Sequence, residues 1–459
     1  MKEVSKKCWN PVFVNDNDAL TPEVWAQEAL MVLENNMVAA NLVYRDYDNE
    51  IAAFGDTVNT HRPGTFVGKR KTDDDEVTVQ DATATNVPVK LNQHIHVSFM
   101  IKDGEESKSF KDLVQLYLTP SLIAQAQMID EVILGQAYEF LGNTVGKLGT
   151  DPDKSAIIAA NEKLNVLKCP IMGRNMILTP NSEGAVLEIG EFTKVNEAGD
   201  AGSALRNAQL GRKFNFEFFM SQNTPSVAAG NTVVAGAVNN VGGYAAKTTV
   251  LTVDGLSAAI ANGTWCTIAG DMQPQMITGT VGGATPTQLT LSPGLAYAVL
   301  NDAVITIYTA GAVNFGGGYV AGYSKEIVVN GFSVAPKTGQ LVSFGTAAER
   351  YSALSTPTTV NILPNRPLDV ALTHTQVAGI GPVGEYNFAF HRNAIALVTR
   401  PLAAPRSGTG ALSSVANYNG LSVRVVITYS GTKQGHLVTV DMLAGVKTLN
   451  ASLGCVMFG

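Results

Sequence analysis

Apolar residues recur at helical spacing in two segments of the first third of the chain. In residues 21–44 the apolar positions follow at steps of three and four: Ala26, Leu30, Leu33, Met37, Ala40 and Tyr44. The same spacing in residues 119–148 relates Leu122, Ala126, Ile129, Ile133, Ala137 and Phe140. Thr21-Pro22 and Thr119-Pro120 each supply a capping residue followed by proline, which suits a helix start. The pattern predicts two amphipathic helices, the second roughly 40 Å long.

Between these helices the spacing changes to that of extended chain. Residues 76–89 and 91–101 read as strands, and the second alternates through Ile95, Val97 and Phe99. Opposite charges precede them in two runs, Lys69-Arg70-Lys71 and Asp73-Asp74-Asp75-Glu76. The pattern predicts a charged hairpin that projects from the body. Because two strands alone are only marginally stable in water, the hairpin is expected to need a partner surface.

From residue 224 helical spacing disappears and short apolar runs rich in Gly, Ala, Thr and Val take over. Residues 224–324 contain only four charged side chains: Lys247, Asp254, Asp271 and Asp302. This composition predicts a separate β-rich unit.

The β-rich unit contains an internal repeat. Val253-Asp254-Gly255-Leu256-Ser257 matches Val329-Asn330-Gly331-Phe332-Ser333, and a further glycine follows at the same distance in each copy, Gly263 and Gly339. Each copy then ends in an alternating strand closed by proline, at Pro293 and Pro364. Two β-modules of one plan, two halves of one barrel, or chance similarity between glycine-rich strands would each account for this.

Mixed character flanks the β-rich unit on both sides. Before it, residues 154–167 are predicted helical and residues 175–178 a strand. After it, residues 394–399 form a predicted strand, and residues 421–429 and 436–440 a hairpin that Asp441 closes. The pattern is that of an α/β body interrupted by an insertion and then completed.

Composition favours a structural protein that is covered by its neighbours. Of 459 residues 45% are hydrophobic and 15% charged, against about 25% charged in an average domain. The formal net charge of -7 makes binding of nucleic acid through a general basic field an unfavourable hypothesis. Four scattered cysteines and an N-terminus without an apolar stretch indicate a reducing compartment, the cytoplasm. Two nearly uncharged stretches, residues 226–246 and 303–324, are broken by Gly and Asn and are poor membrane spans.

Sequence signatures of catalysis are missing. Residues 64–70 and 142–148 approach a phosphate-binding loop, but each has three residues instead of four between its glycines and lacks the hydroxyl after lysine. His94 and His96 would share one strand face, yet zinc needs a third ligand and His61 is the only other histidine nearby. A polar strand face is the favoured interpretation, so no catalytic residue, metal site or cofactor is predicted.

The two charged runs have similarly plain interpretations. The Asp73–Glu76 run lacks the alternating oxygen ligands and central glycine of a calcium loop. A solvated acidic tip, or one facing a basic patch on another subunit, is favoured. The Lys69–Lys71 run has no interleaved aromatic side chains for nucleic acid and is more typical of a salt-bridging surface.

The order of three stretches identifies a family. The first is a helical arm, an extended segment ending in residues 91–99 (LNQHIHVSF) and a long helix from Pro120. The second is residues 211–225 (GRKFNFEFFMSQNTP), an apolar strand before a Ser-x-Asn-x-Pro turn. The third comprises residues 388–402, 420–425 and 441–446 near the end. In this order the chain resembles the major capsid proteins of tailed bacteriophages with the HK97-like fold, most closely the P22-type coat proteins.

The resemblance implies an α+β fold with an insertion. Its parts would be an N-terminal arm (residues 1–50), an extended E-loop hairpin (51–108), the spine helix with the first part of the P- and A-domains (109–223), a β-rich insertion of two similar modules (224–370) and the completion of the P- and A-domains (371–459). The repeat and the size of the insertion depart from the single small barrel of P22-type proteins.

The resemblance also implies a function without catalysis. Many copies would assemble as hexamers and pentamers into the icosahedral head of a double-stranded DNA phage, first as a procapsid with scaffolding protein and portal. The subunit would be made in the host cytoplasm and reside in the virion, near packaged DNA, away from membranes, and open to a decoration protein. The hairpin would lie over a neighbouring subunit, with these candidate contact residues: Lys69, Arg70, Lys71, Asp73, Asp74, Asp75 and Glu76.

Other classes of protein fit less well. An encapsulin-like compartment shell shares the fold and is the nearest alternative. A surface-layer protein would need an export signal, which residues 1–20 do not supply. A metal-dependent enzyme would rest on His94 and His96 alone.

Overall fold

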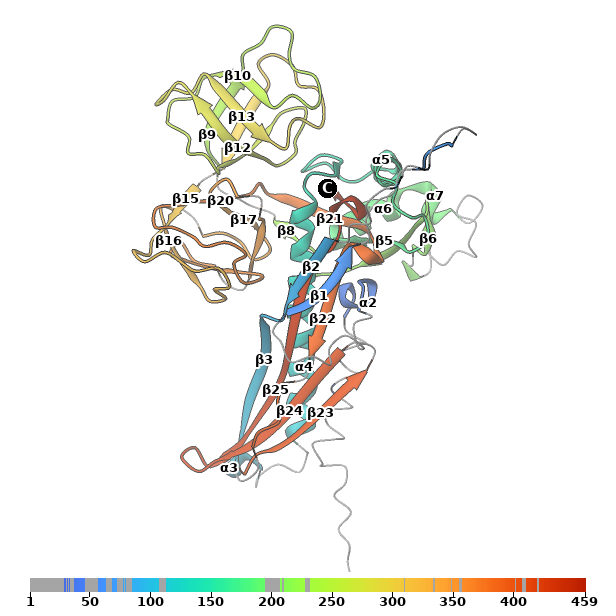
Figure 1. Cartoon of the computed structure of the whole chain (residues 1–459), viewed down its shortest axis with the longest axis vertical. Coiled ribbons are helices and arrows are strands. Elements are labelled where there is room, and N and C mark those ends of the chain that lie inside the picture. Colours follow the sequence, from blue (N-terminus) through green and yellow to red (C-terminus); the bar gives the residue numbers. More distant parts are fainter. Residues whose placement is uncertain are drawn as a thin grey trace, which may run out of the picture.

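The chain forms an elongated molecule of several lobes, seen in a computed structural model (Figure 1). Apart from a few single positions, the described residues are 37–45, 57–62, 68–71, 85–106, 113–194, 210–227, 232–308, 310–332, 335–347, 349–354, 357–400, 402–406, 410–418 and 421–459. A limb runs down one side, a second sheet with short helices lies above it, and two barrels lie beside that sheet.

The limb is a five-stranded antiparallel sheet backed by one helix. Its path is β22 (Ile395–Arg400), β25 (Gly435–Thr448), β24 (Leu421–Ser430) and β23 (Leu412–Tyr418), and β3 (Gln93–Lys102) pairs with β25. Helix α4 (Leu113–Leu134) places Leu122 and Ile129 in one core with Val425 and Val440 of the sheet. The apolar alternation of the strands and the helical stripe therefore meet in this core.

A mixed seven-stranded sheet, the upper sheet, adjoins the limb. Its order is β4 (Thr144–Val145), β26 (Gly454–Phe458), β21 (Gly384–His391), β5 (Arg174–Leu178), β7 (Phe216–Met220) and β6 (Arg212–Lys213), and β8 (Ser226–Val227) pairs with β21. Helices α5 (Lys154–Val166), α6 (Pro180–Glu188) and α7 (Gly190–Thr193) accompany it. Helix and sheet occur together in both lobes, so the predicted α+β class is confirmed.

Two closed barrels are inserted between β8 and β21. The first has the order β10-β13-β12-β11-β14-β9 and contains β9 (Thr232–Val238), β10 (Val250–Asp254), β11 (Trp265–Ile268), β12 (Gln275–Val281), β13 (Gln288–Ser292) and β14 (Val304–Tyr308). The second contains β15 (Ala310–Val313), β16 (Ile327–Asn330), β17 (Leu341–Phe344), β18 (Tyr351–Leu354), β19 (Asn361–Pro364) and β20 (Val377–Ile380). Its order, β15-β16-β19-β18-β17-β20, is a closed ring of six strands like that of the first barrel.

Equivalent residues of the internal repeat make equivalent contacts in the two barrels. Tyr244 bridges to Val299 and its hydroxyl accepts the N–H of Thr252 (2.9 Å). In the second barrel the corresponding bridge joins Tyr319 to Leu372, and the hydroxyl of Tyr319 accepts the N–H of Val328 (2.8 Å). The repeat is thus one six-stranded barrel present twice. Strand β20 closes the second barrel and lies beyond residue 370, where the β-rich insertion was predicted to end. The sequence repeat ends at the strand closed by Pro364, so it gave no signal for this further short strand.

Several predicted elements are confirmed. Helix α5, strand β5 and strand β22 coincide with the predictions for residues 154–167, 175–178 and 394–399 within a residue or so. The hairpin of residues 421–440 is also present as β24 and β25. Asp441 does not end it, however, because β25 continues to Thr448 in a ladder with β22.

The long helix differs from its prediction at both ends. Helix α4 begins at Leu113, so Pro120 lies inside it, with its ring on an exposed face. A proline removes one backbone donor wherever it stands, and Ser121 Oγ donates back to Tyr117 O (2.7 Å) in the same turn. The α-helix ends at Leu134, continues as a 3-10 helix over Gly135–Phe140, and gives way to β4. It is therefore shorter than the predicted span to residue 148.

The predicted hairpin of residues 76–101 is wrong in its pairing. Strand β2 (Thr85–Lys90) pairs antiparallel with β1 (Thr57–Arg62), while β3 pairs along its full length with β25. The alternation of Ile95 and Ile101 matches a half-buried sheet face, and that face belongs to the limb core. Much of the predicted arm helix, residues 21–44, lies outside the described residues. Within it Ala29 and Leu33 are buried, and α2 covers Ala39–Leu42.

No described helix has both the length and the apolar character needed to cross a bilayer.

Candidate functional site

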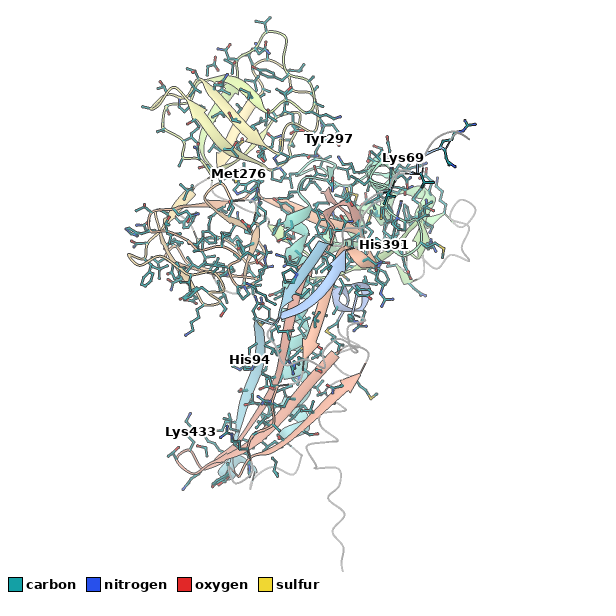
Figure 2. All side chains as sticks on the ribbon, viewed as in Figure 1. Lys69, His94, Met276, Tyr297, His391 and Lys433 are labelled. Carbon is teal, nitrogen blue, oxygen red and sulfur yellow. The ribbon has the colours of Figure 1, made fainter. Side chains whose placement is uncertain are left out.

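The structure describes three of the residues predicted to contact a neighbouring subunit. Lys69, Arg70 and Lys71 are exposed, and Figure 2 places Lys69 on the side of the molecule near the upper sheet, far from Lys433, which marks the limb tip. Asp73, Asp74, Asp75 and Glu76 lie outside the described residues. Just beyond them Val77 is 72% exposed and Val79 86% exposed. Apolar side chains exposed beside an acidic run are available for a partner.

The His94–His96 pair lies on the outward face of the limb sheet. The ring centroids are 5.8 Å apart, and His94 Nε2 is 3.7 Å from a carboxylate oxygen of Asp441. Asp441 is also bound by Arg424, whose Nε donates to Oδ1 at 2.8 Å and whose Nη2 donates to Oδ2, the oxygen nearest His94. No cluster of three metal-ligating side chains occurs in the described part of the chain. The carboxylate that faces His94 thus belongs to a partly buried Arg424–Asp441 ion pair, which sequence spacing did not reveal.

The first barrel is joined to the upper sheet by hydrogen bonds around the loop after β4. The N–H of Leu148 donates to Met272 O (3.0 Å) and Nε2 of Gln273 donates to Gly146 O (3.1 Å). The hydroxyl of Thr144 donates to Oε1 of the same glutamine. These three hydrogen bonds join neutral groups, half of the backbone and half of side chains.

A buried carboxylate shapes the barrel side of this joint. Asp271 is completely buried, and its Oδ1 accepts the N–H of Tyr297 at 2.7 Å. Its other oxygen accepts the side-chain N–H of Gln275. Burial raises the pKa of Asp271 to about 6, against the opposing effects of its backbone hydrogen bonds and of Lys147. The carboxylate fixes the two loops that face the upper sheet.

The second barrel is joined to α4 and the following 3-10 helix through a buried arginine. Arg366 is 5% exposed, pairs with Glu139, and forms a second ion pair with Asp369 at 3.1 Å. Its guanidinium also donates to Gln136 Oε1 (3.3 Å) and stacks on Tyr351 at 4.6 Å. Further hydrogen bonds run from Asn365 Nδ2 to Val132 O (3.3 Å) and from Tyr138 Oη to Gly339 O (2.5 Å). This joint is ionic, unlike that of the first barrel.

A third joint ties the N-terminal segment to α4. The carboxylate of Asp130, 1% exposed, accepts the N–H groups of Val38 (2.8 Å) and Ala40 (3.2 Å) at the start of α2. Burial raises the pKa of Asp130 to about 6, although these bonds oppose the shift. One carboxylate therefore holds a segment that lies 90 positions earlier in the chain.

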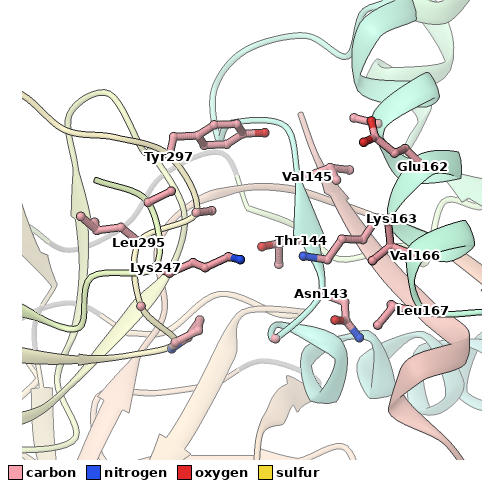
Figure 3. Close-up of a pocket in the computed structure, with 16 residues that line it drawn as sticks. Asn143, Thr144, Val145, Glu162, Lys163, Val166, Leu167, Lys247, Leu295 and Tyr297 are labelled. Atoms are coloured by element: carbon pink, nitrogen blue, oxygen red, sulfur yellow. The ribbon is translucent and has the colours of Figure 1, made fainter. Parts of the chain in front are cut away.

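A cleft separates the first barrel from α5 and β4 (Figure 3). Its volume is about 570 Å³, and its walls carry both apolar and basic side chains. The close-up shows the ammonium groups of Lys163 and Lys247 pointing toward each other from opposite walls, with Thr144 between them. Sequence analysis named Lys247 only as one of the rare charges in residues 224–324, and gave no signal for Lys163.

Comparison with known proteins gives structural likenesses only. No protein-family model matches the chain, and no curated protein sequence is similar to it. Its structure is similar to that of Mycobacterium phage Che8, with 13% identity over 92% of this chain and 90% of that chain and a TM-score of 0.43. It is similar to the capsid of Ralstonia phage GP4 (10% identity, 91% and 86%, TM-score 0.42) and to that of Cyanophage P-SCSP1u (9%, 88% and 84%, TM-score 0.40). Likenesses with TM-scores below 0.5 establish neither a family nor a function for this chain.

Proposed function

We propose that the chain is the major capsid protein of a tailed double-stranded DNA phage, a structural subunit that closes with many copies of itself into an icosahedral shell. The observation that carries the proposal is the limb. It is only two layers thick, one helix on a five-stranded sheet, and it extends away from the other lobes (Figure 1). A lobe this thin leaves its edges and much of its surface to neighbouring copies.

The order of the lobes along the chain supports the same proposal. An N-terminal segment, the β1–β2 hairpin, helix α4 and an upper sheet follow in the sequence expected of the HK97-like fold. On this proposal the limb corresponds to the P-domain, the upper sheet to the A-domain, and the two barrels to the insertion domain. P22-type proteins would be the relatives with an insertion at this place, here doubled.

The partners follow from the same proposal. Scaffolding protein and portal would be needed to close a procapsid, and packaged DNA would lie near the shell without sequence-specific contact. The two shifted carboxyl groups fit a structural role, because Asp130 binds the start of α2 to α4 and Asp271 accepts the N–H of Tyr297 within the first barrel.

The size of the purified species tests the proposal. The subunit, produced together with the scaffolding protein of the same phage, is expected to give closed shells of megadalton mass by light scattering and negative-stain electron microscopy. A species that stays at the subunit mass of 48.4 kDa under these conditions would contradict it.

A further inference from the structure

The cleft between the first barrel and α5 concentrates positive charge. Lys163 of α5 and Lys247 of the β9–β10 connection aim their ammonium groups at one another (Figure 3). Neither lysine forms an ion pair with a residue that the structure describes. A third cation, Lys147, lies 5.4 Å from the ring centroid of Tyr297 at the cleft edge. Glu162 also lines the cleft but lies away from the facing pair in this view.

The backbone of Lys247 is held in a conformation that favours glycine. Its φ is 72°, in the left-handed region. The loop enforces this conformation, because the N–H of Lys247 donates to Leu295 O at 2.6 Å. A side chain at such a position costs on the order of 1 kcal/mol, and such strain is typically kept where the side chain has a use. The side chain of Lys247 reaches into the cleft (Figure 3).

The walls specify the chemistry of the occupant. Facing ammonium groups repel one another, and an anion between them relieves the repulsion. The remaining walls include the apolar side chains of Val145, Leu167 and Leu295. A ligand that suits both parts carries carboxylates next to apolar groups, which describes an acidic peptide better than the phosphate backbone of a nucleic acid.

One segment of the chain has this composition. Residues 73–79 read Asp-Asp-Asp-Glu-Val-Thr-Val, four acidic side chains followed by two valines. Val77 and Val79 are exposed in the single chain, so their own copy does not cover them. We propose that residues 73–79 of one copy dock in the Lys163–Lys247 cleft of a second copy. The proposal rests on the proposed self-assembly and names the two surfaces that meet in it.

Isotope-coded crosslinking tests where the segment docks. Shells are assembled from an equal mixture of unlabelled and ¹⁵N-labelled subunits and treated with a carbodiimide, which joins a lysine directly to a neighbouring carboxylate. The expected products are peptides that link Lys163 or Lys247 to residues 73–76, with half of the linked pairs of mixed isotope. Linked pairs of a single isotope only would place the contact within one copy and overturn the proposal, as would shells without these crosslinks.

Charge exchange provides the second measurement. The variants K163E/K247E and D73K/D74K/D75K are each expected to lower shell yield at least about tenfold, because a weak contact is repeated in every subunit. The yield should recover when the two sets are combined in one chain. A control variant, K325E/K337E, changes two exposed lysines of the second barrel and should assemble normally.

The outcomes separate this proposal from the proposed function. Normal shells from K163E/K247E would reject the docking and leave the capsid assignment intact. Failure of the unmodified protein to form shells would reject both. Thermal unfolding of the variants checks that they are folded, and loss of yield without recovery in the combined chain counts against the docking.

Discussion

The first barrel (β9–β14) and the second (β15–β20) share one plan of six strands, yet different chemistry attaches them to the rest of the molecule. Asp271, three residues after the end of β11, is buried in the first joint. The residue at the equivalent position of the second barrel, three residues after the end of β17, is Ala347. Two residues past the closing proline, the second barrel has Arg366 and the first has Leu295. The repeated plan survives in the strands, and the loops that face the body differ.

This difference shows which part of a duplicated module is free to change. The strands must keep the alternation that fills each barrel, so the repeat is visible there. The joints face different partners, the loop after β4 in one case and the end of α4 in the other. One joint therefore relies on neutral hydrogen bonds and a buried carboxylate, and the other on an arginine.

Loss of the ionic joint should have the largest effect. Arg366→Met removes the partner of Glu139 and one of two cations beside Asp369, which keeps Lys447 at 3.6 Å. The change is expected to lower the stability of the second barrel by about 3–5 kcal/mol, because the partly buried carboxylate of Glu139 loses its cation. Hydrogen exchange of amides in β16–β19 measures this locally. Lys325→Met, an exposed change in the same barrel, is the control and should stay within about 0.5 kcal/mol. An equal loss in the first barrel would show that the barrels unfold as one unit.

The contact between the barrels should come next. Trp265 Nε1 donates to Ser343 Oγ at 2.8 Å in a buried setting. Ser343→Ala leaves that donor unsatisfied, which is expected to cost about 1–3 kcal/mol. Amide hydrogen exchange should become faster in both β11 and β17. The control variant Ser257→Ala, at an exposed position, should leave exchange in both strands unchanged. An effect confined to β17 would mean that the indole finds another acceptor.

The pH dependence of stability should also distinguish the two joints, with a smaller effect. The folded-state pKa of Asp271 is about 6, above its ordinary value of 3.8, so the folded first barrel binds this proton more tightly than the unfolded chain does. The stability that results is fully present below 3.8 and is lost as the pH rises through about 6. The first barrel is therefore expected to be about 1 kcal/mol more stable at pH 5 than at pH 7.

Exchange of the β11–β14 amides, corrected for intrinsic rates at the two pH values, measures this difference. Asp271→Asn keeps an acceptor for Tyr297 and removes the ionisable group, so its barrel should show no such gain. A gain that persists in this variant would assign the proton to another residue.

The smallest effect should be the same in both barrels. Tyr244→Phe and Tyr319→Phe each remove one hydroxyl that accepts a backbone N–H. Each is expected to cost about 0.5–1.5 kcal/mol, and the two costs should agree within error. Matched thermal unfolding of the two variants measures both costs. A clear inequality would contradict the prediction and show that the equivalent positions no longer contribute equally to stability.

Local patterns in the sequence predicted local structure well. The spacing of α5, the apolar runs of β5 and β22 and the turn of the β24–β25 hairpin depend on neighbours in the chain, and all are confirmed. The repeat signal similarly lies within single strands. The class of the fold could be predicted for this reason.

Contacts between distant residues could not be predicted in the same way. Strand β3 alternates as any half-buried strand does, and nothing in it identifies β25 as its partner. Arg366 and Glu139 lie far apart in the sequence, as do Asp130 and Val38. The cleft is also of this kind, because Lys163 and Lys247 face each other only after the barrel has docked. The rarity of charge around Lys247 was the one available signal.

Strand β25 gives the limb a mechanical property. It runs for 14 residues and pairs with β3, β24 and β22 along different parts of its length. Because antiparallel hydrogen bonds lie perpendicular to the strands, a pull along the limb loads them together in shear instead of opening them one at a time. A force on the turn at its tip would thus pass through one continuous strand to β22, next to the upper sheet. The limb is therefore suited to carry tension along its axis.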